Sequence, residues 1–222
     1  VPFRGCTALI GITVDKSSAN FFSEEGVLFT KNMDTLVSYP IGKTATNYIL
    51  PSTLTVIKDN AFSNCTTLTS ITLPQGVTLI GESAFRGCTG LASLTLPVSI
   101  DSIGMYGFYD CSGLRNIYCS NPTPINIEFP GMFGNLDVFI GVLKYACTLH
   151  VPTGSLAAYK AAGGWKDFAA IVDDISTVPS ISESSLIIVT EGNNILIKNV
   201  EAGTTIHIYT SNGILLLQKY AY

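Results

Sequence analysis

The sequence is short of charge and of long apolar runs. Only 13% of its 222 residues are Asp, Glu, Lys or Arg, and the formal net charge is −4. A nucleic-acid binder needs a basic face, so this composition excludes that class of protein. No apolar run reaches the roughly 18 residues that a membrane span requires, and we expect no transmembrane segment.

The residue types on which many enzymes and metal sites depend are also scarce. His150 and His207 are the two histidines, and the six cysteines contain no Cys-x-x-Cys pair. A zinc site therefore lacks a ligand set, and a nucleophile lacks the neighbouring base that would activate it. We predict a non-enzymatic protein with no catalytic, cofactor-binding or metal-binding residues.

What the sequence does contain is a repeat of 23 residues. Three tandem copies, each opening with Leu-Pro, fill residues 50–72, 73–95 and 96–118. Aromatic and thiol slots recur in register: Phe62, Phe85 and Phe108, then Cys65, Cys88 and Cys111. A fixed period with apolar residues in fixed slots predicts a solenoid, whose units are too small to bury a core alone and must stack.

One unit predicts two short extended pieces and a turn. Ile71 alternates with Ser70 and Thr72, which favours a strand with Ile71 inward and its neighbours outward. A second extended piece covers residues 77–80. A helical or 3₁₀ turn at residues 83–85 would then drive the aromatic ring inward. Stacked rungs lie about 4.8 Å apart, so we expect the Phe rings to form a column.

The pattern LPxxVxxIGxxAFxxCxxLxxI, seen at residues 73–94 with Leu94 in its last slot, resembles the BspA-like leucine-rich repeat. That subclass occurs in surface and secreted proteins of Gram-negative anaerobes and some protists. The resemblance covers about residues 1–172. It implies a leucine-rich repeat solenoid that acts as an adhesion or ligand-binding module, and it names no ligand.

The region before the regular copies is expected to hold part of one repeat and a hairpin. Residues 3–9 copy residues 85–91, so the sequence begins in mid-repeat, with a strand carrying Leu9, Ile12 and Val14. We therefore expect a piece of a longer protein, and the missing signal peptide says little about location. Residues 27–30 and 36–39 predict a β-hairpin.

The region after the regular copies is expected to close the solenoid and start a second domain. A short helix that starts with Thr153 as its capping residue and ends at residue 162, followed by Trp165 and Phe168, would cap the last rung within about residues 153–168. We assign residues 1–172 to the solenoid, 173–184 to a linker and 185–222 to a small antiparallel β domain. Residues 203–218, GTTIHIYTSNGILLLQ, resemble part of the C-terminal sorting domains of proteins exported by type IX secretion.

The cysteines divide into two groups. Four share one repeat slot and predict a ladder of small buried thiols: Cys6, Cys65, Cys88 and Cys111. Cys119 and Cys147 lie outside that ladder, one at each end of an irregular segment. A disulfide between them is an open alternative in an oxidising compartment.

Alternation along the strands predicts one outward polar face, which is our candidate binding face. It consists of Asn47, Ser70, Thr72, Ser93, Thr95, Asn116, Tyr118 and His150. We expect a monomer, at the cell surface or secreted, that binds a host or matrix protein or a glycan there. The alternatives are an ordinary solvated sheet and a purely structural spacer within a larger exported protein.

Overall fold

The computed structural model describes residues 3, 5–129 and 136–175, together with the backbone of four strands at residues 187–191, 194–198, 205–209 and 215–220. The chain divides into two compact units, Val1–Thr177 and Val178–Tyr222. The first unit is a β-solenoid of about six turns with mostly parallel strands. The predicted leucine-rich repeat solenoid is therefore confirmed.

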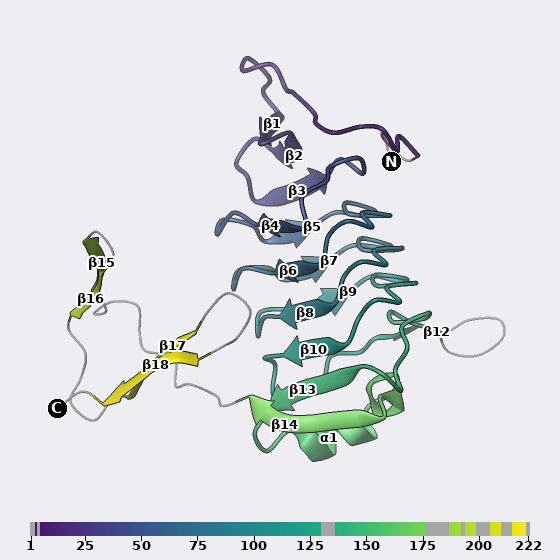
Figure 1. Ribbon diagram of the computed structural model, residues 1–222. Coiled ribbons are helices and arrows are strands. Elements are labelled where there is room, and N and C mark those ends of the chain that lie inside the picture. Colours follow the sequence, from purple (N-terminus) through teal and green to yellow (C-terminus); the bar gives the residue numbers. More distant parts are fainter. Residues whose placement is uncertain are drawn as a thin grey trace. The chain divides into compact units, whose positions relative to one another are not determined.

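One wall of the solenoid is a parallel sheet of order β14-β13-β10-β8-β6-β4, which we call the main sheet (Figure 1). Its strands are β4 (Asn47–Ile49), β6 (Ser70–Thr72), β8 (Ser93–Leu96), β10 (Asn116–Cys119), β13 (Thr148–Pro152) and β14 (Ala170–Ile175). Ser70 pairs with Ser93 and Ser93 with Asn116, so successive strands are related by the sequence repeat. Ile71 is buried between exposed Ser70 and Thr72, as the alternation predicts.

The second sheet has the order β1-β2-β3-β5-β7-β9. Its strands are β1 (Phe21–Glu24), β2 (Val27–Thr30), β3 (Thr35–Ser38), β5 (Val56–Ile57), β7 (Leu79–Ile80) and β9 (Ser102–Ile103). Strands β2 and β3 form the predicted antiparallel hairpin, and β3 continues into parallel pairing with β5. The sequence did not predict β1, which pairs antiparallel with β2.

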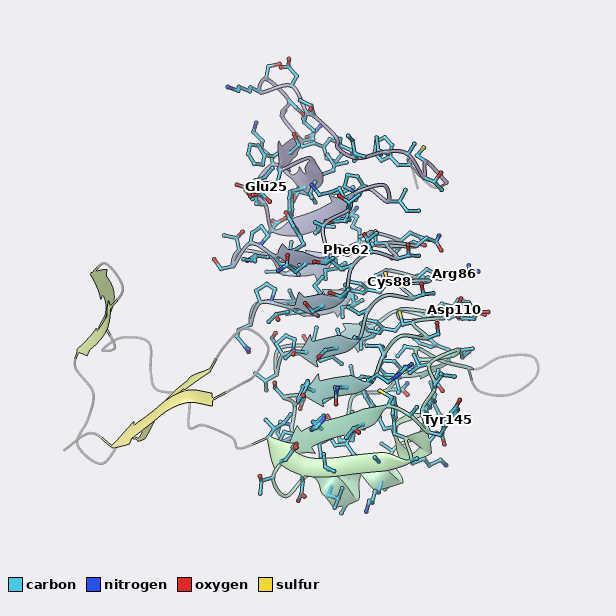
Figure 2. The ribbon with its side chains drawn as sticks, in the orientation of Figure 1. Glu25, Phe62, Arg86, Cys88, Asp110 and Tyr145 are labelled. Carbon is cyan, nitrogen blue, oxygen red and sulfur yellow. The ribbon has the colours of Figure 1, made fainter. Side chains whose placement is uncertain are left out.

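Inside the solenoid, aromatic rings form a continuous column; Figure 2 labels Phe62, one of its members. The ring centroids of Phe62 and Phe85 lie 4.9 Å apart, and those of Phe85 and Phe108 lie 5.1 Å apart, with planes within 7°. Tyr39 extends the column at one end and Phe139 at the other. The spacing is close to that of neighbouring strands, and it confirms the predicted column.

Turns, rather than a helix or 3₁₀ helix, carry the Phe side chains inward. Each unit has a residue with left-handed backbone at one shared slot: Asn60, Ser83 and Tyr106, with φ of 60°, 55° and 59°. A residue in this region cannot continue a right-handed helix. The segment therefore forms single hydrogen-bonded turns and no continuous helix; the Arg86 N–H bond to the Ser83 carbonyl is the i to i+3 bond of the expected 3₁₀ turn.

The segment before the hairpin departs from the prediction. Residues 9–14 form no strand, and Ile10 is 72% exposed. The Ile12 amide instead donates to the carbonyl of Gly26, at the tip of the β1–β2 turn. Residues 9–14 therefore contact the β1–β2 turn and do not pair with β4, the end strand of the main sheet. Cys6 is exposed as well, so the buried thiol ladder begins at Cys65.

The thiol ladder itself lies beside the ring column. Cys65, Cys88 and Cys111 are buried and free. The Cys88 thiol donates to the carbonyl of Phe62 at 3.1 Å, one unit earlier, and Cys111 repeats this contact with Phe85. The thiols therefore link successive rungs as well as filling the core.

The last rung is closed by a short helix and a 3₁₀ turn. Helix α1 (Leu156–Ala161) starts after Ser155, not after Thr153 as its sequence suggests, and η1 spans Trp165–Asp167. Trp165 packs edge-on against Phe139 and its indole N–H donates to the Ile125 carbonyl. A small antiparallel pair, β11 (Glu128–Phe129) and β12 (Leu136–Asp137), precedes this cap.

The end of the solenoid lies later than predicted. Strand β14 runs to Ile175, so residues 173–175 belong to the main sheet and not to the linker. Residues 176–184 of that linker lie outside the described part. In the second unit, β15 (Ile187–Glu191) pairs antiparallel with β16 (Asn194–Lys198), and β17 (Thr205–Tyr209) with β18 (Leu215–Tyr220).

Candidate functional site

The outward face of the main sheet consists of two straight rows of side chains. Register places Asn47, Ser70, Ser93, Asn116, Thr148 and Ala170 in the first row. The second row holds Ile49, Thr72, Thr95, Tyr118, His150 and Val172. All eight residues of the candidate binding face are therefore brought together on one surface.

The hydroxyl groups on this face are available to a ligand. Elsewhere on the solenoid, hydroxyls link neighbouring units: Thr69 Oγ1 donates to the Thr46 carbonyl at 3.0 Å and Ser99 Oγ to the Val77 carbonyl at 2.6 Å. On the outward face, the hydroxyls of Ser70, Thr72, Ser93 and Thr95 make no hydrogen bond to any described residue. Water or a partner must satisfy them.

Near its C-terminal end the face carries a fixed polar cluster. The rings of Tyr118 and His150 stack at 4.3 Å. His150 Nδ1 lies 2.8 Å from the Asp174 carboxylate, and Nε2 lies 3.2 Å from Asn116 Oδ1. Because three neighbours hold the imidazole ring, it is presented in one orientation, which lowers the ordering cost of binding.

Sequence reasoning missed five members of this face: Ile49, Thr148, Ala170, Val172 and Asp174. Ile49 is 90% exposed beside Thr72, although its outward slot follows from the same alternation that placed Asn47. Asp174 was assigned to a linker because it lies in an acidic, Ser-rich stretch. The signal that could have found it was the apolar segment at residues 170–172, which repeats the inward and outward pattern of β13.

The buried thiols are poor candidates for nucleophiles. Burial raises the pKa of Cys65 and of Cys111 to about 12, and that of Cys88 well above its ordinary value. The thiolate is the reactive form, so these groups stay protonated at neutral pH. Among the residues that the structure describes, no group of three or more His, Cys, Asp or Glu could hold a metal.

The alternative disulfide between Cys119 and Cys147 is not formed; both thiols are buried and free. Asn116 pairs with Thr148 and Tyr118 with His150, which puts Cys119 beyond one end of this pairing and Cys147 before the other. At about 3.3 Å per residue, the two sites lie on the order of 13 Å apart along the strands. A disulfide requires Cα atoms within about 7 Å.

Within the described residues, no helix has the length and apolar character needed to traverse a bilayer.

Comparison with known proteins identifies the repeat. Residues 42–135 match the family model described as "BspA type Leucine rich repeat region (6 copies)". A solved leucine-rich repeat protein from Eubacterium ventriosum is 28% identical over 64% of this chain, with a TM-score of 0.54. A leucine rich cell surface protein from Faecalibacterium prausnitzii is 26% identical over 53% of the chain and 37% of its own, with a TM-score of 0.42.

The chain spans 35% of the length of the Eubacterium ventriosum structure. No curated protein matches the sequence.

Proposed function

We propose that this chain, whose residues 42–135 match the BspA-type leucine-rich repeat model, is a non-catalytic surface or secreted binding module. The module mediates adhesion to a host or matrix protein or to a glycan. Its binding surface is the outward face of the main sheet.

The observation that carries this proposal is the set of unsatisfied hydroxyls on the outward face. Solenoid stacking does not use them, whereas it uses hydroxyls at other positions. The face has little charge, and its rows of hydroxyl and amide groups can both donate and accept hydrogen bonds. A neutral, polar partner surface or a sugar with many hydroxyls matches this chemistry.

The Tyr118 and His150 pair supplies the anchoring part of the face. Aromatic residues are enriched among the few side chains that dominate binding energy. The stack with His150 and the contact of His150 with Asp174 order these side chains before binding. Thr72 and Thr95 lie in the same row, so a ligand that follows the row contacts both groups.

The experiment is a binding screen on an array of extracellular-matrix proteins and glycans, followed by affinity measurement for each retained component. Thr95→Lys places a long cation on the outward row, where the half-buried Thr95 side chain points away from the core. We expect this change, and Tyr118→Ala with it, to weaken binding roughly tenfold, the loss typical of an interface anchor. Thermal unfolding of each variant checks that the fold is retained.

A matched control is Ser102→Lys, since Ser102 is exposed on β9 of the second sheet. Equal losses in Thr95→Lys and Ser102→Lys would show that the outward face has no special role. If the array retains nothing, the structural-spacer alternative replaces the binding proposal.

A further inference from the structure

A second cluster lies away from the main sheet, on the turns that join the two sheets. The Arg86 guanidinium lies 5.0 Å from the ring centroid of Tyr109. Tyr109 in turn meets Tyr106 edge to face, with ring centroids 5.5 Å apart. We call Arg86, Tyr106 and Tyr109 the turn-edge patch. Figure 2 labels Arg86 and Asp110 on this edge of the solenoid.

Stacking of the repeat does not require these side chains. Arg86 and Tyr109 occupy the slot that holds Ser63 in the first unit, and Tyr106 occupies the slot of Asn60 and Ser83. The backbone at Tyr106 is left-handed, with φ of 59°. Asn tolerates this conformation far better than a bulky aromatic residue. The fold therefore carries large side chains here where small ones suffice.

Arg86 is also free to bind an anion. The side chain is exposed, and its guanidinium makes no ion pair or hydrogen bond with any described residue. Arg86 Cζ lies over the Tyr109 ring, and no described residue takes the N–H groups of the guanidinium. In this geometry arginine can hold a carboxylate with two parallel hydrogen bonds.

From these observations we infer that the turn-edge patch is a second docking site, for an acidic peptide segment of a protein partner. The open edge of Arg86 takes an Asp or Glu side chain, and the two tyrosines take the apolar parts of neighbouring residues. Tyr and Arg together are the composition of binding hot spots between proteins. This site is separate from the outward face of the main sheet and stands without it.

The ring geometry favours a peptide over a saccharide. A sugar stacks on an open, flat aromatic face, but the planes of Tyr106 and Tyr109 are 89° apart and form no flat platform. Arg86 covers one face of Tyr109 as well. An acidic glycan also carries a carboxylate that Arg86 could bind. It is the competing ligand class, and the experiment must distinguish it from a peptide.

The test uses the whole chain and an array of short synthetic peptides, each made in an acidic form with Asp and Glu and a neutral form with Asn and Gln. We expect the acidic forms to be retained over their neutral pairs. Affinity for a retained peptide should fall roughly tenfold in Arg86→Gln and in Tyr109→Ser, since each removes an anchor. Tyr109→Ser restores the residue type found at Ser63, so the fold tolerates it.

Two controls fix the location. Arg115→Gln removes the same charge elsewhere, where the guanidinium already bonds the Ser112 and Leu114 carbonyls. Thr95→Lys alters the main-sheet face. Both should keep the peptide affinity of the unmodified chain.

The inference is overturned if acidic and neutral peptides bind alike or not at all, or if Arg115→Gln loses as much affinity as Arg86→Gln. It is also overturned if the Arg86-dependent ligand proves to be a sialic-acid or uronic-acid glycan on a parallel glycan array. Failure of the main-sheet proposal would leave these results unchanged, because the two sites share no residue.

Discussion

The two faces of the main sheet come from the same strands but differ in how their side chains vary. The inward row repeats one chemistry and is buried throughout: Ile71, Leu94, Ile117 and Leu149. The outward row does not keep one chemistry: it runs from Thr72 and Thr95 to Tyr118 and His150. Each unit must fit its neighbour inside the solenoid, whereas packing sets no such demand outside. Stability therefore depends on the inward face, and the opposite face of the same strands is the one for which we propose binding.

The largest effect should come from breaking the inner side at the ring column. Phe85 is fully buried between Phe62 and Phe108. Phe85→Ala leaves a cavity that neighbouring rungs cannot close, and we expect it to lower the free energy of unfolding by about 3–5 kcal/mol. Denaturant titration measures this loss. A loss under about 1 kcal/mol would contradict a column that holds the fold.

A control for that change is Leu79→Ala on β7, where the side chain is 38% exposed. It should cost clearly less than Phe85→Ala, because less apolar surface returns to water.

A smaller effect per pH unit should appear in the pH dependence of stability. Burial raises the pKa of Cys65 and Cys111 to about 12 in the folded chain, against about 8.5 for an unfolded thiol. At pH values between these two pKa values, the thiols of the unfolded chain lose protons that the thiols of the folded chain keep. The stability contributed below about pH 8.5 is therefore lost as pH rises toward 12, by up to about 1.4 kcal/mol per pH unit for each thiol.

Urea titrations at a series of pH values measure this slope. Cys111→Ala should make it shallower, whereas Cys6→Ala should not, since Cys6 is exposed. An unchanged slope in Cys111→Ala would mean that the inner thiols are not the groups that titrate.

Periodicity predicts most of the fold because stacking forces the same residue types into the same slots. Phe62, Phe85 and Phe108 could be stacked from sequence alone, and strict alternation placed Tyr118 and His150 outward. Where packing between unlike segments decides the structure, the repeat carries no information. The Ile12 contact with Gly26 and the resulting loss of a strand at residues 9–14 are of this kind.

The candidate site was predictable in part for the same reason. Its rows follow from alternation, but the contact of His150 with Asp174 joins residues 24 apart across β13 and β14. The β-bulge between His150 and Pro152 shifts the register at this point, so counting along the strands does not bring the two together. By contrast, Arg86 and Tyr109 stack one unit apart in one slot, and the repeat length alone could have paired them.

The most direct test of the division between faces uses two adjacent residues of β8. Leu94 is fully buried and Thr95 lies on the outward row. The measurement is the free energy of unfolding of Leu94→Ala and of Thr95→Ala in the same denaturant. We predict a loss of about 2–5 kcal/mol for Leu94→Ala and under about 1 kcal/mol for Thr95→Ala. Equal losses would contradict the account.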